Sequence, residues 1–462
     1  MRRLLTLALL AGCTVGPDWQ QPKVPTPPAW RIDYAQAADL ANARWWQAFG
    51  DPVLDQLVDE SLRNNRDLLQ AAARVDQFLG ALRTTRSQLY PQIGYNGAVS
   101  RNRASETNGL APPGDRNYSL YEAALGASWQ IDLFGRVRRQ AEAAQAQVYA
   151  TEQGRRGVVL SVVSATATAY IGLRALDRQL EIARATEENY ARSLRLFEAR
   201  HRRGAVSEVE RSQVESQYRQ AQAAIPSFER QVAQQENLLS VLLGRNPGDV
   251  PRGKPIEQLL DPVIPPGLPA TLLERRPDIL QAEQNLRAAN ATIGVAKSLY
   301  FPTLSLTGFL GLSSSSLSDF TKSASGTGAI VAALAGPIFT FGGIEGQVAS
   351  AQAGEREALA LYQQVVLNAL RETNDALVGV QKLREEYDAL AKRTVALRTY
   401  ARLSRSRYEG GATSYIEVLY AENELFTAEL AGISTLAQRH AELVNLYKAL
   451  GGGWVDAVDP AR

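Results

Sequence analysis

The sequence predicts a mainly helical protein with four short β-strands, arranged as two tandem copies of one structural unit. Three observations predict this fold class. The chain repeats itself at a period near 210 residues, each copy contains a long stretch without proline, and each copy contains two segments of alternating apolar and polar residues. Alternation is the pattern of a strand with one buried face, and a long stretch free of proline is compatible with an unbroken helix.

The internal repeat is visible as ungapped matches. A shift of 211 residues places Asp67–Ala71 over Asp278–Ala282, and a shift of 207 places Arg200–Glu210 over Arg407–Glu417. Matches at a fixed period indicate a duplicated architecture. We therefore expect six segments: a signal peptide (1–12), an acylated extended tether (13–43), a first repeat (44–250), a linker (251–271), a second repeat (272–451) and a C-terminal tail (452–462).

The amino terminus has the pattern of a secretion signal with a lipid anchor. Two arginines precede a short apolar run, Leu4–Ala11, which is too short to span a bilayer. The run ends in Leu-Ala-Gly-Cys, which looks like the bacterial lipobox, so we expect Cys13 to be acylated. Cys13 is the only cysteine, which makes a plain buried thiol the weaker interpretation. Thr14 follows it, where an aspartate usually retains a lipoprotein at the inner membrane, so Thr14 favours the outer membrane.

The helices of each repeat are predicted from proline positions and apolar spacing. A first helix, at 55–89 or 272–299, ends before a proline. A longer helix follows at 136–203 or 343–409, and at ~1.5 Å per residue each is roughly 100 Å long, so it must be a rod. Apolar residues recur along both rods at coiled-coil-like steps.

Each rod is predicted to turn at a glycine loop and to return as a second helix. The loops lie at 203–207 and 410–414, and the returning helices at 208–243 and 415–450. Pro226 lies inside the first returning helix, which we expect it to kink or split.

Four strands are predicted, at 92–101, 119–129, 303–312 and 328–337. Their length suits a tilted membrane strand, and with no unbroken run of 18 apolar residues we expect no membrane-spanning helix. Hydrocarbon does not tolerate an open sheet edge, and single-chain barrels have about eight strands or more, so several chains would share one barrel. Two chains or three would satisfy this, and a pore favours three. Small soluble hairpins beside the helices are the alternative.

The composition argues against several other functions. The chain has 50 Lys+Arg and 48 Asp+Glu, so it has no basic excess for nucleic acid. One cysteine excludes an intramolecular disulfide and a thiolate zinc site, and two histidines, His201 and His440, leave little for acid–base chemistry. No Gly-rich phosphate loop or metal cluster is visible, so we expect neither an enzyme nor a cofactor.

Long motifs occur in order along the mature chain. They are GCTVGPDW at the start, RWWQAFGDPVLDQLVDESLRNN at 44–65, LPATLLERRPDILQAEQNLRAANATIGVAKSLYFPTLSLTG, GPIFTFGG at 336–343 and YKALGGGW near the end. These motifs resemble the outer membrane factors of the TolC/OprM type, particularly the NodT-like lipoprotein branch. The resemblance covers residues 13 to about 454.

The resemblance implies a homotrimer. Each chain would give four strands to a twelve-stranded transmembrane barrel and its helices to a long periplasmic α-helical barrel. Such proteins are the exit duct of tripartite efflux systems that export drugs, dyes and detergents. An inner membrane pump, commonly of the resistance-nodulation-division (RND) type, supplies the energy, and a periplasmic adaptor couples the pump to the duct.

The resemblance also implies that the two helical turns touch the adaptor. These positions are Arg200, Gly204, Ala205, Val206, Ser207, Arg407, Gly411, Ala412, Thr413 and Ser414. A structural role is compatible with this contact, because glycine ends a helix in the left-handed conformation and serine caps the next one. Glu210 and Glu417, three residues after the serines, predict a capping box at each turn. We expect His201 to be exposed at this turn and not a ligand.

In the family that this chain resembles, the second helix pair lines a closed aperture. Ile416 matches a hydrophobic constriction, and Tyr420 stands where relatives commonly carry an aspartate of the gating ring. This departure puts a charged lock in doubt, and helical spacing places Glu417 and Glu422 on other faces. We expect a gate formed by Ile416 and Tyr420 packing across the threefold axis.

Two other functions were weighed. A structural periplasmic coiled-coil lipoprotein would need no strands of barrel length, and a self-contained porin would need more strands than four. The sequence does not name the substrate, so export of metals or signalling oligosaccharides stays open beside export of drugs.

Overall fold

A computed structural model describes residues 14–22, 44–105, 116–262 and 275–452. Its contacts divide the chain into two compact units. The first unit comprises Met1–Lys23, Arg74–Glu152 and Gln281–Gln363, and the second comprises Val24–Ala73, Gln153–Leu280 and Gln364–Arg462. Each unit therefore takes segments from both predicted repeats. The signal peptide, Cys13 and most of the tether, together with most of the tail, lie outside the described residues.

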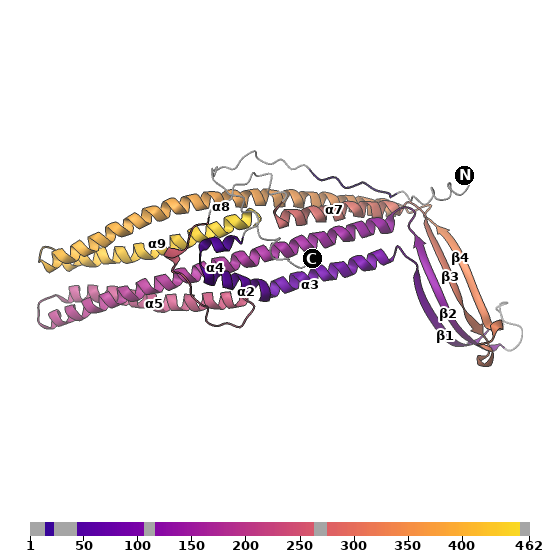
Figure 1. Ribbon diagram of the computed structural model, residues 1–462, viewed down its shortest axis with the longest axis horizontal. Helices are drawn as coiled ribbons and strands as arrows, with labels where there is room; N and C mark the ends of the chain where they lie inside the picture. The colour runs from indigo at the N-terminus through magenta and orange to yellow at the C-terminus, as the bar shows by residue number, and fades with distance from the viewer. Residues whose placement is uncertain (1–13, 23–43, 106–115, 263–274, 453–462) are drawn as a thin grey trace. The chain divides into compact units, whose positions relative to one another are not determined.

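The two rods of the sequence prediction are confirmed as continuous helices. Helix α4 spans Arg136–Arg202 and α8 spans Gly343–Glu409. They return as α5, Glu208–Leu242, and α9, Tyr415–Ala449 (Figure 1). Helix α5 runs through Pro226 without ending, so the predicted split is wrong.

The shorter helices differ from the prediction at their boundaries. A single helix over 55–89 was predicted, but the structure has two, α2 at Pro52–Asn64 and α3 at Arg66–Ser87. Asn65 between them has extended backbone, and its Oδ1 accepts hydrogen bonds from the backbone N–H of Asp67 and Leu68, at 2.9 and 3.2 Å. Asn65 thus caps α3, and asparagine is among the residues most favoured at this position of a helix. In the second repeat, α7 spans Pro277–Ser298.

Among the described helices, α4 alone has the length and hydropathy of a membrane-spanning helix. Helix α4 contains an 18-residue window with mean hydropathy 1.5, long and apolar enough to cross a membrane. The expectation of no such helix required an unbroken apolar run and therefore missed it. Because 72% of the window is buried inside the protein, this apolar stretch serves as packing surface.

The core of the second unit forms where α4, α5 and α9 meet a short N-terminal 3₁₀ helix, η1, at Trp45–Phe49. Trp45 stacks on Tyr447 with ring centroids 5.2 Å apart. Asp51, which is fully buried, caps α2 and accepts a hydrogen bond of 2.7 Å from the Tyr170 hydroxyl. The same hydroxyl accepts from the Gly253 backbone N–H at 2.9 Å. The linker and the first repeat are therefore joined by a buried polar network.

The first unit contains one antiparallel sheet with the strand order β1-β2-β3-β4 (Figure 1). The strands span Gln92–Arg103, Asn117–Ile131, Thr303–Ser314 and Gly326–Ala335. All four predicted strands are present; the first three extend about two residues beyond the prediction, and β4 ends before Gly336 and Pro337. The pairing of β2 with β3 joins the two repeats in one sheet. Strands β1 and β4 are its edges.

The two faces of the sheet differ sharply in composition. Because side chains alternate along a strand, the pairing register assigns each residue to a face. The face that we call the apolar face comprises Ile93, Tyr95, Gly97, Val99, Tyr121, Ala123, Leu125, Ala127, Trp129, Ile131, Leu304, Leu306, Gly308, Leu310, Leu312, Gly328, Ile330, Ala332 and Leu334. At one end of the sheet the same face continues into polar and small residues, which are Arg101, Arg103, Asn117, Ser119, Ser314 and Gly326. The opposite face carries mostly polar and small residues, among them Gln92, Asn96, Ser100, Gln130, Ser305 and Thr307, and its large aliphatic and Phe side chains are Leu120, Phe309 and Val331. Its only charged residue in the described strands is Glu122.

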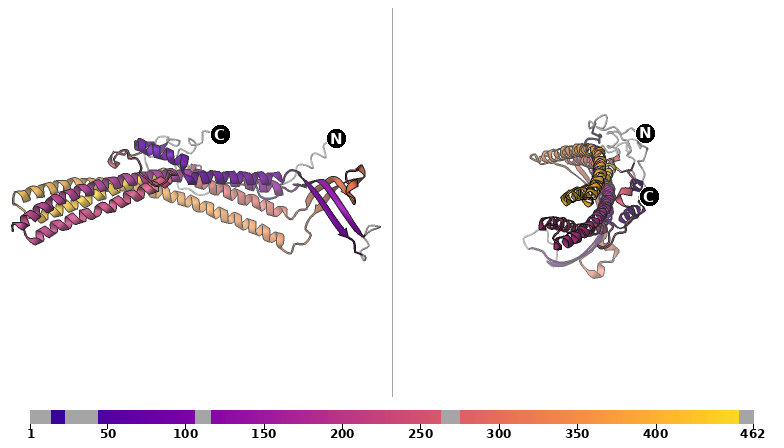
Figure 2. Two further views of the ribbon diagram at one scale, coloured as in Figure 1. Left: turned by 90° about the horizontal axis from the view of Figure 1, so that it is seen from below. Right: turned by 90° about the vertical axis from the view of Figure 1, so that its left-hand side faces the viewer.

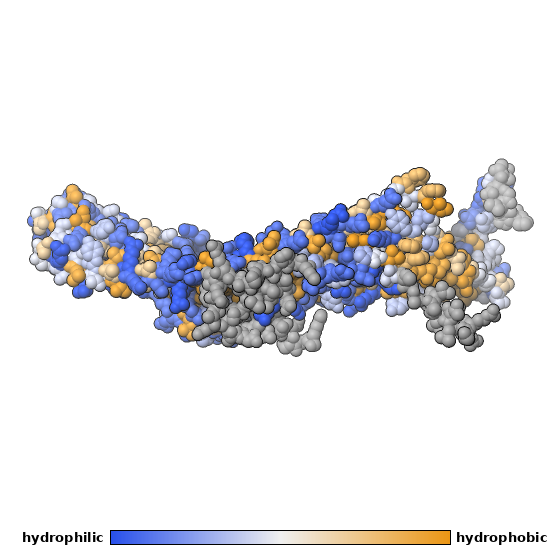
Figure 3. Space-filling model, turned by 90° about the horizontal axis from the view of Figure 1, so that it is seen from above, coloured by the Kyte–Doolittle hydropathy of each residue, from blue (hydrophilic) through white to orange (hydrophobic). Residues whose placement is uncertain are grey.

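Much of the apolar face is uncovered. Ile93, Tyr95 and Ile330 are each exposed by more than three quarters of their side-chain area, at 79%, 89% and 84%. Apolar residues gather toward the strand end of the space-filling view (Figure 3). An exposed apolar surface of this size marks a contact with lipid or with another protein.

Candidate functional site

The two predicted turns have the same backbone geometry. Gly204 and Gly411 both have φ of +71°, the left-handed conformation that favours glycine. The backbone N–H of Ala205 donates to the Arg200 carbonyl at 2.9 Å, and that of Ala412 donates to the Arg407 carbonyl at 2.8 Å. These bonds close the last helical turn before each loop. The loop residues are largely exposed, and an added Cβ at either glycine would meet nothing within 4 Å.

The turns differ in how the next helix is capped. Ser207 and Glu210 form the predicted capping box, with Glu210 N–H donating to Ser207 Oγ at 3.2 Å and Ser207 N–H donating to Glu210 Oε2 at 2.7 Å. The prediction of the same box in the second turn is wrong, because the Ser414 side chain makes no capping bond. The carboxylate of Glu417 is engaged elsewhere: it accepts from Thr413 Oγ1 and pairs with Arg407 at 3.4 Å.

The α4–α5 and α8–α9 hairpins run beside each other in the second unit (Figure 2). Near the turns they pack through a cluster that contains several aromatic side chains. The rings of Phe197 and Tyr415 lie 4.3 Å apart between centroids, and Tyr408 lies 4.8 Å from Tyr415. Arg200 Nη1 donates to the Tyr408 hydroxyl at 2.6 Å. The predicted tip residue Arg200 is therefore also a link between the two hairpins.

A second link involves a carboxylate that sequence analysis considered for the gate. Glu422 is paired with Arg405, and only 10% of its side chain is exposed. Arg405 also donates to Asn189 on the other hairpin at 3.3 Å. Burial is the largest influence on the pKa of Arg405 and lowers it, but the charge and hydrogen bond of Glu422, with the nearby Tyr415 and Glu409, together outweigh burial and leave the pKa raised. Glu422 is thus committed to packing and unavailable to line an aperture.

The two predicted gate residues lie together on the uncovered side of α9. Ile416 is 57% exposed and Tyr420 is 60% exposed, and one helical turn separates them. Their neighbours Val418 and Leu419 are buried in the cluster between the hairpins. These two large, exposed side chains on adjacent helical turns form an apolar surface of the kind that binds another protein element.

Charges at the first tip form a local network. The pKa of Glu208 is lowered to about 2 because it accepts hydrogen bonds from Arg211. His201 has 39% of its side chain exposed and lies near the same carboxylate, with Nε2 3.3 Å from Glu208 Oε2. Within the described ranges, no group of three His, Cys, Asp or Glu side chains could hold a metal ion.

The segment that follows the predicted lipid anchor is docked onto the first unit. We call residues 14–22 the anchor segment. Arg139 has only 6% of its side chain exposed, and it donates to Asp18 at 2.8 Å and to the Val15 carbonyl at 3.4 Å. Gly16 has φ of +112° and its backbone crosses that of Gly294 closely. A Cβ added to Gly16 would lie 2.4 Å from the Gly294 Cα, and one added to Gly294 would lie 2.7 Å from the Val15 carbonyl oxygen. The anchor segment is therefore held by specific contacts, whereas the sequence predicted an extended tether.

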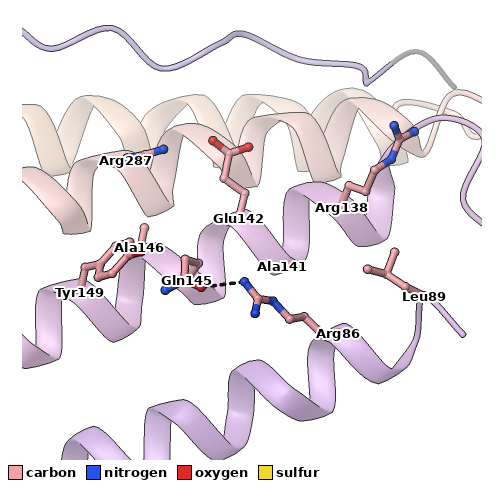
Figure 4. Close-up of a pocket in the computed structure, with 9 residues that line it drawn as sticks. All are labelled: Arg86, Leu89, Arg138, Ala141, Glu142, Gln145, Ala146, Tyr149 and Arg287. Carbon is pink, nitrogen blue, oxygen red and sulfur yellow. Dashed lines mark hydrogen bonds between the residues drawn. The ribbon is translucent and has the colours of Figure 1, made fainter. Parts of the chain in front are cut away.

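A cavity of about 280 Å³ with a mixed lining lies in the same unit between α3, α4 and α7 (Figure 4). Arg86, Arg138, Glu142 and Arg287 line it. Arg86 donates to Gln145 at 2.7 Å and Arg138 pairs with Asp132 at 3.3 Å, so two of the three guanidinium groups are already engaged. We assign this cavity to helix packing.

Sequence reasoning missed the contacts between the hairpins and the role of Arg139. Both depend on pairs far apart in the chain, such as Arg200 with Tyr408, that no short motif marks. The glycines Gly16 and Gly294 are the signal that could have predicted the docked anchor segment, since close backbone approach requires residues without a Cβ.

Comparisons with known proteins agree with this architecture. The model of the outer membrane efflux protein family matches residues 57–245 and 268–452. A solvent efflux pump outer membrane protein of Pseudomonas putida, SrpC, is 34% identical over 462 residues, covering 98% of this chain and 97% of that protein. The cation efflux system protein CusC of Escherichia coli is 33% identical, with 96% of each covered.

Solved structures give the same answer. The open-state MtrE outer membrane channel of Neisseria gonorrhoeae is 31% identical, covers 96% of this chain and 99% of its own, and superposes with a TM-score of 0.87. The TM-score and the coverage show that the whole fold is shared and not only one unit. The chain therefore belongs to the outer membrane efflux protein family, and it is an outer membrane component of an efflux system.

Proposed function

We propose that this protein is a passive, gated duct of a tripartite efflux system, working as a homotrimer whose chains share one twelve-stranded barrel. The observation that carries the proposal is the sheet of the first unit, with one apolar face, one polar face and two free edges. An apolar face suits hydrocarbon and a polar face suits a water-filled lumen. The duct needs no catalytic step, because an inner membrane pump would supply the energy.

The edges of the sheet require partner chains. In hydrocarbon, each unpaired backbone group costs several kcal/mol, so β1 and β4 cannot face lipid. Pairing β4 of one chain with β1 of the next removes every edge once the ring closes. Three chains give twelve strands, enough for an open lumen, whereas the eight strands of two chains would be filled by side chains.

The anchor and the tips also have a place in this assembly. Cys13, acylated and followed by the docked anchor segment, would attach each chain to the membrane. The exposed tips at 203–207 and 410–414 would bind a periplasmic adaptor, which in turn binds a pump, of the RND type in our proposal. One relative is named for the efflux of solvents and another for the efflux of cations. Because ducts of this family serve such different substrates, we propose that this duct exports drugs and other small molecules.

The gate is proposed to be apolar. Three copies of Ile416 and Tyr420, exposed in the single chain, would pack across the threefold axis and cover one another. Their carboxylate neighbours Glu417 and Glu422 are paired within the chain, so a charged ring is disfavoured. The opposing proposal, a structural spacer without channel activity, leaves the apolar face of the sheet without a purpose.

Two experiments test these proposals. Light scattering of the mature protein in mild detergent gives its mass, and planar-bilayer recordings give its conductance. We expect a trimer with a small, mostly closed conductance. A monomer that stays soluble without detergent once Cys13 is replaced would overturn the shared barrel and favour the spacer.

The gate is tested by Tyr420→Ala, for which we expect a higher open probability in planar bilayers and raised antibiotic permeability of cells. The matched control is Val209→Ala, because Val209 is the equivalent of Ile416 in the first hairpin and is 66% exposed. Val209→Ala should leave the conductance unchanged. Unchanged conductance in Tyr420→Ala would count against the apolar gate.

A further inference from the structure

The apolar face of the sheet ends in two positive charges at the end away from the helices. On β1 the residues of this face continue from Val99 to Arg101 and Arg103, which pair with Ser119 and Asn117 of β2. Both arginines are exposed. They are the only charged residues on that face among the described strand residues, and no described carboxylate pairs with either guanidinium.

The distance along the strand places these arginines at a membrane boundary. From Ile93 to Arg101 the strand rises eight residues, about 27 Å at ~3.4 Å per residue, or about 20 Å across the membrane at a tilt of ~40°. Outer membrane barrels have an apolar band of roughly 25 Å. The arginines therefore lie where the hydrocarbon ends.

The other end of the same face has the features of the opposite boundary. Trp129 lies there, and its indole N–H donates to the Leu89 carbonyl, at the end of the α3 segment, at 3.0 Å. Tryptophan at this depth is typical of a membrane interface. The helices are joined to the strands at this end, so the arginines belong to the outer leaflet if the helices are periplasmic.

We propose that Arg101 and Arg103 form a binding surface for the phosphate groups of the glycolipid in the outer leaflet. This inference rests on the proposed barrel. The Cα atoms of Arg101 and Arg103 are about 7 Å apart along one face of the strand, and each guanidinium presents donors in the fork geometry that matches phosphate. Acyl chains of the same lipid would lie on Val99, Tyr95 and Tyr121 below them, so that one molecule meets both the charges and the apolar band.

The experiment compares lipid binding by four versions of the purified protein in neutral detergent: the parent, two variants of Arg101 and Arg103, and one control variant. The probes are lipid A with its phosphates, the same lipid after removal of the phosphates, and inorganic phosphate. For Arg101→Gln with Arg103→Gln we expect roughly 30-fold weaker binding of lipid A, since each basic residue near an anionic membrane surface contributes about fivefold. Binding of the dephosphorylated lipid should not change.

The control is Arg74→Gln with Arg83→Gln, which removes the same charge from exposed positions of α3 and should bind lipid A like the parent. Arg101→Lys with Arg103→Lys keeps the charge and should stay within a few-fold of the parent. Equal lipid A affinity of the parent and the glutamine variant would overturn the proposal. Binding of inorganic phosphate as tight as that of lipid A would also overturn it, because the site would then recognise a free anion.

Conductance measured on the same samples separates this inference from the proposed function. A conducting parent whose lipid A affinity does not depend on Arg101 and Arg103 refutes the lipid surface alone. A parent that forms no channel refutes the barrel, and the lipid surface with it. Should the double glutamine variant fail to assemble, the single variants Arg101→Gln and Arg103→Gln carry the test. Each is expected to bind lipid A about fivefold more weakly, and parent-like affinity in both would refute the proposal.

Discussion

The stability of the protein should fall in mild acid because of one buried histidine. His440 on α9 is 1% exposed, and its ring meets Phe49 edge to face with centroids 5.8 Å apart. Its Nδ1 lies 3.6 Å from Asp261, which is itself paired with Arg439. Burial lowers the pKa of His440 from 6.5 to about 4, and the Arg439 charge adds to this, while the Ile256 backbone acts in the opposite direction.

The sign and size of the effect follow from this lowered pKa. The unfolded chain binds the His440 proton more readily than the folded chain, so stability is full above about pH 6.5 and is lost as pH falls toward 4. With pKa values of 6.5 and about 4, the loss is about 2 kcal/mol at pH 5 and about 0.2 kcal/mol at pH 7.

The assay is the free energy of unfolding from urea titrations at pH 7, 6 and 5. We expect His440→Leu, which keeps an apolar side chain beside Phe49 and removes the titrating ring, to lose about 2 kcal/mol less than the parent between pH 7 and pH 5. His201→Gln is the matched control, because His201 is the only other histidine and lies partly exposed at the tip. If His440→Leu and the parent show the same pH slope, His440 is not the group responsible and the reasoning fails.

Three further predictions concern local contacts. Ser207→Ala should cost about 1 kcal/mol of stability because it removes a capping bond, whereas Ser414→Ala should cost a few tenths at most, and equal costs would contradict the difference in capping. Tyr170→Phe should cost about 1–3 kcal/mol, since it leaves buried groups unpaired, and a neutral result in urea titrations would contradict the network. Gly16→Ala should speed hydrogen exchange of the Val15 amide about fivefold to thirtyfold, because a positive φ costs an alanine about 1–2 kcal/mol, and unchanged protection would show that the anchor segment is not held there.

Elements set by local rules were predictable from the sequence. Proline-free periodic stretches gave α4 and α8 to within a residue, and alternation gave all four strands. The glycine turns were predictable for the same reason, since Gly204 and Gly411 act on their own helix ends. The break at Asn65 was missed because the apolar pattern continues through it, although asparagine is favoured as an N-cap and was the signal for a new helix.

Features set by tertiary context were not predictable. The repeat predicted equal caps at Ser207 and Ser414, but Glu417 has competing partners in Thr413 and Arg407 that only the folded turn reveals. The pairing of β2 with β3 joins strands that are far apart in sequence, and no local pattern in either strand identifies its partner. The buried Arg139 looks like any surface arginine until Asp18 and the Val15 carbonyl are placed beside it.

The difference between the two turns has an evolutionary consequence. Duplication gave the chain two hairpins with one inherited design, and the first still has the capping box built on Ser207. In the second, the glutamate at the equivalent place is engaged by other side chains, and Ile416 and Tyr420 stand next to it where the first hairpin has Val209 and Gln213. Selection therefore acts on a mutation at one tip independently of the other, so one copy can keep its inherited cap while the residues around the other change.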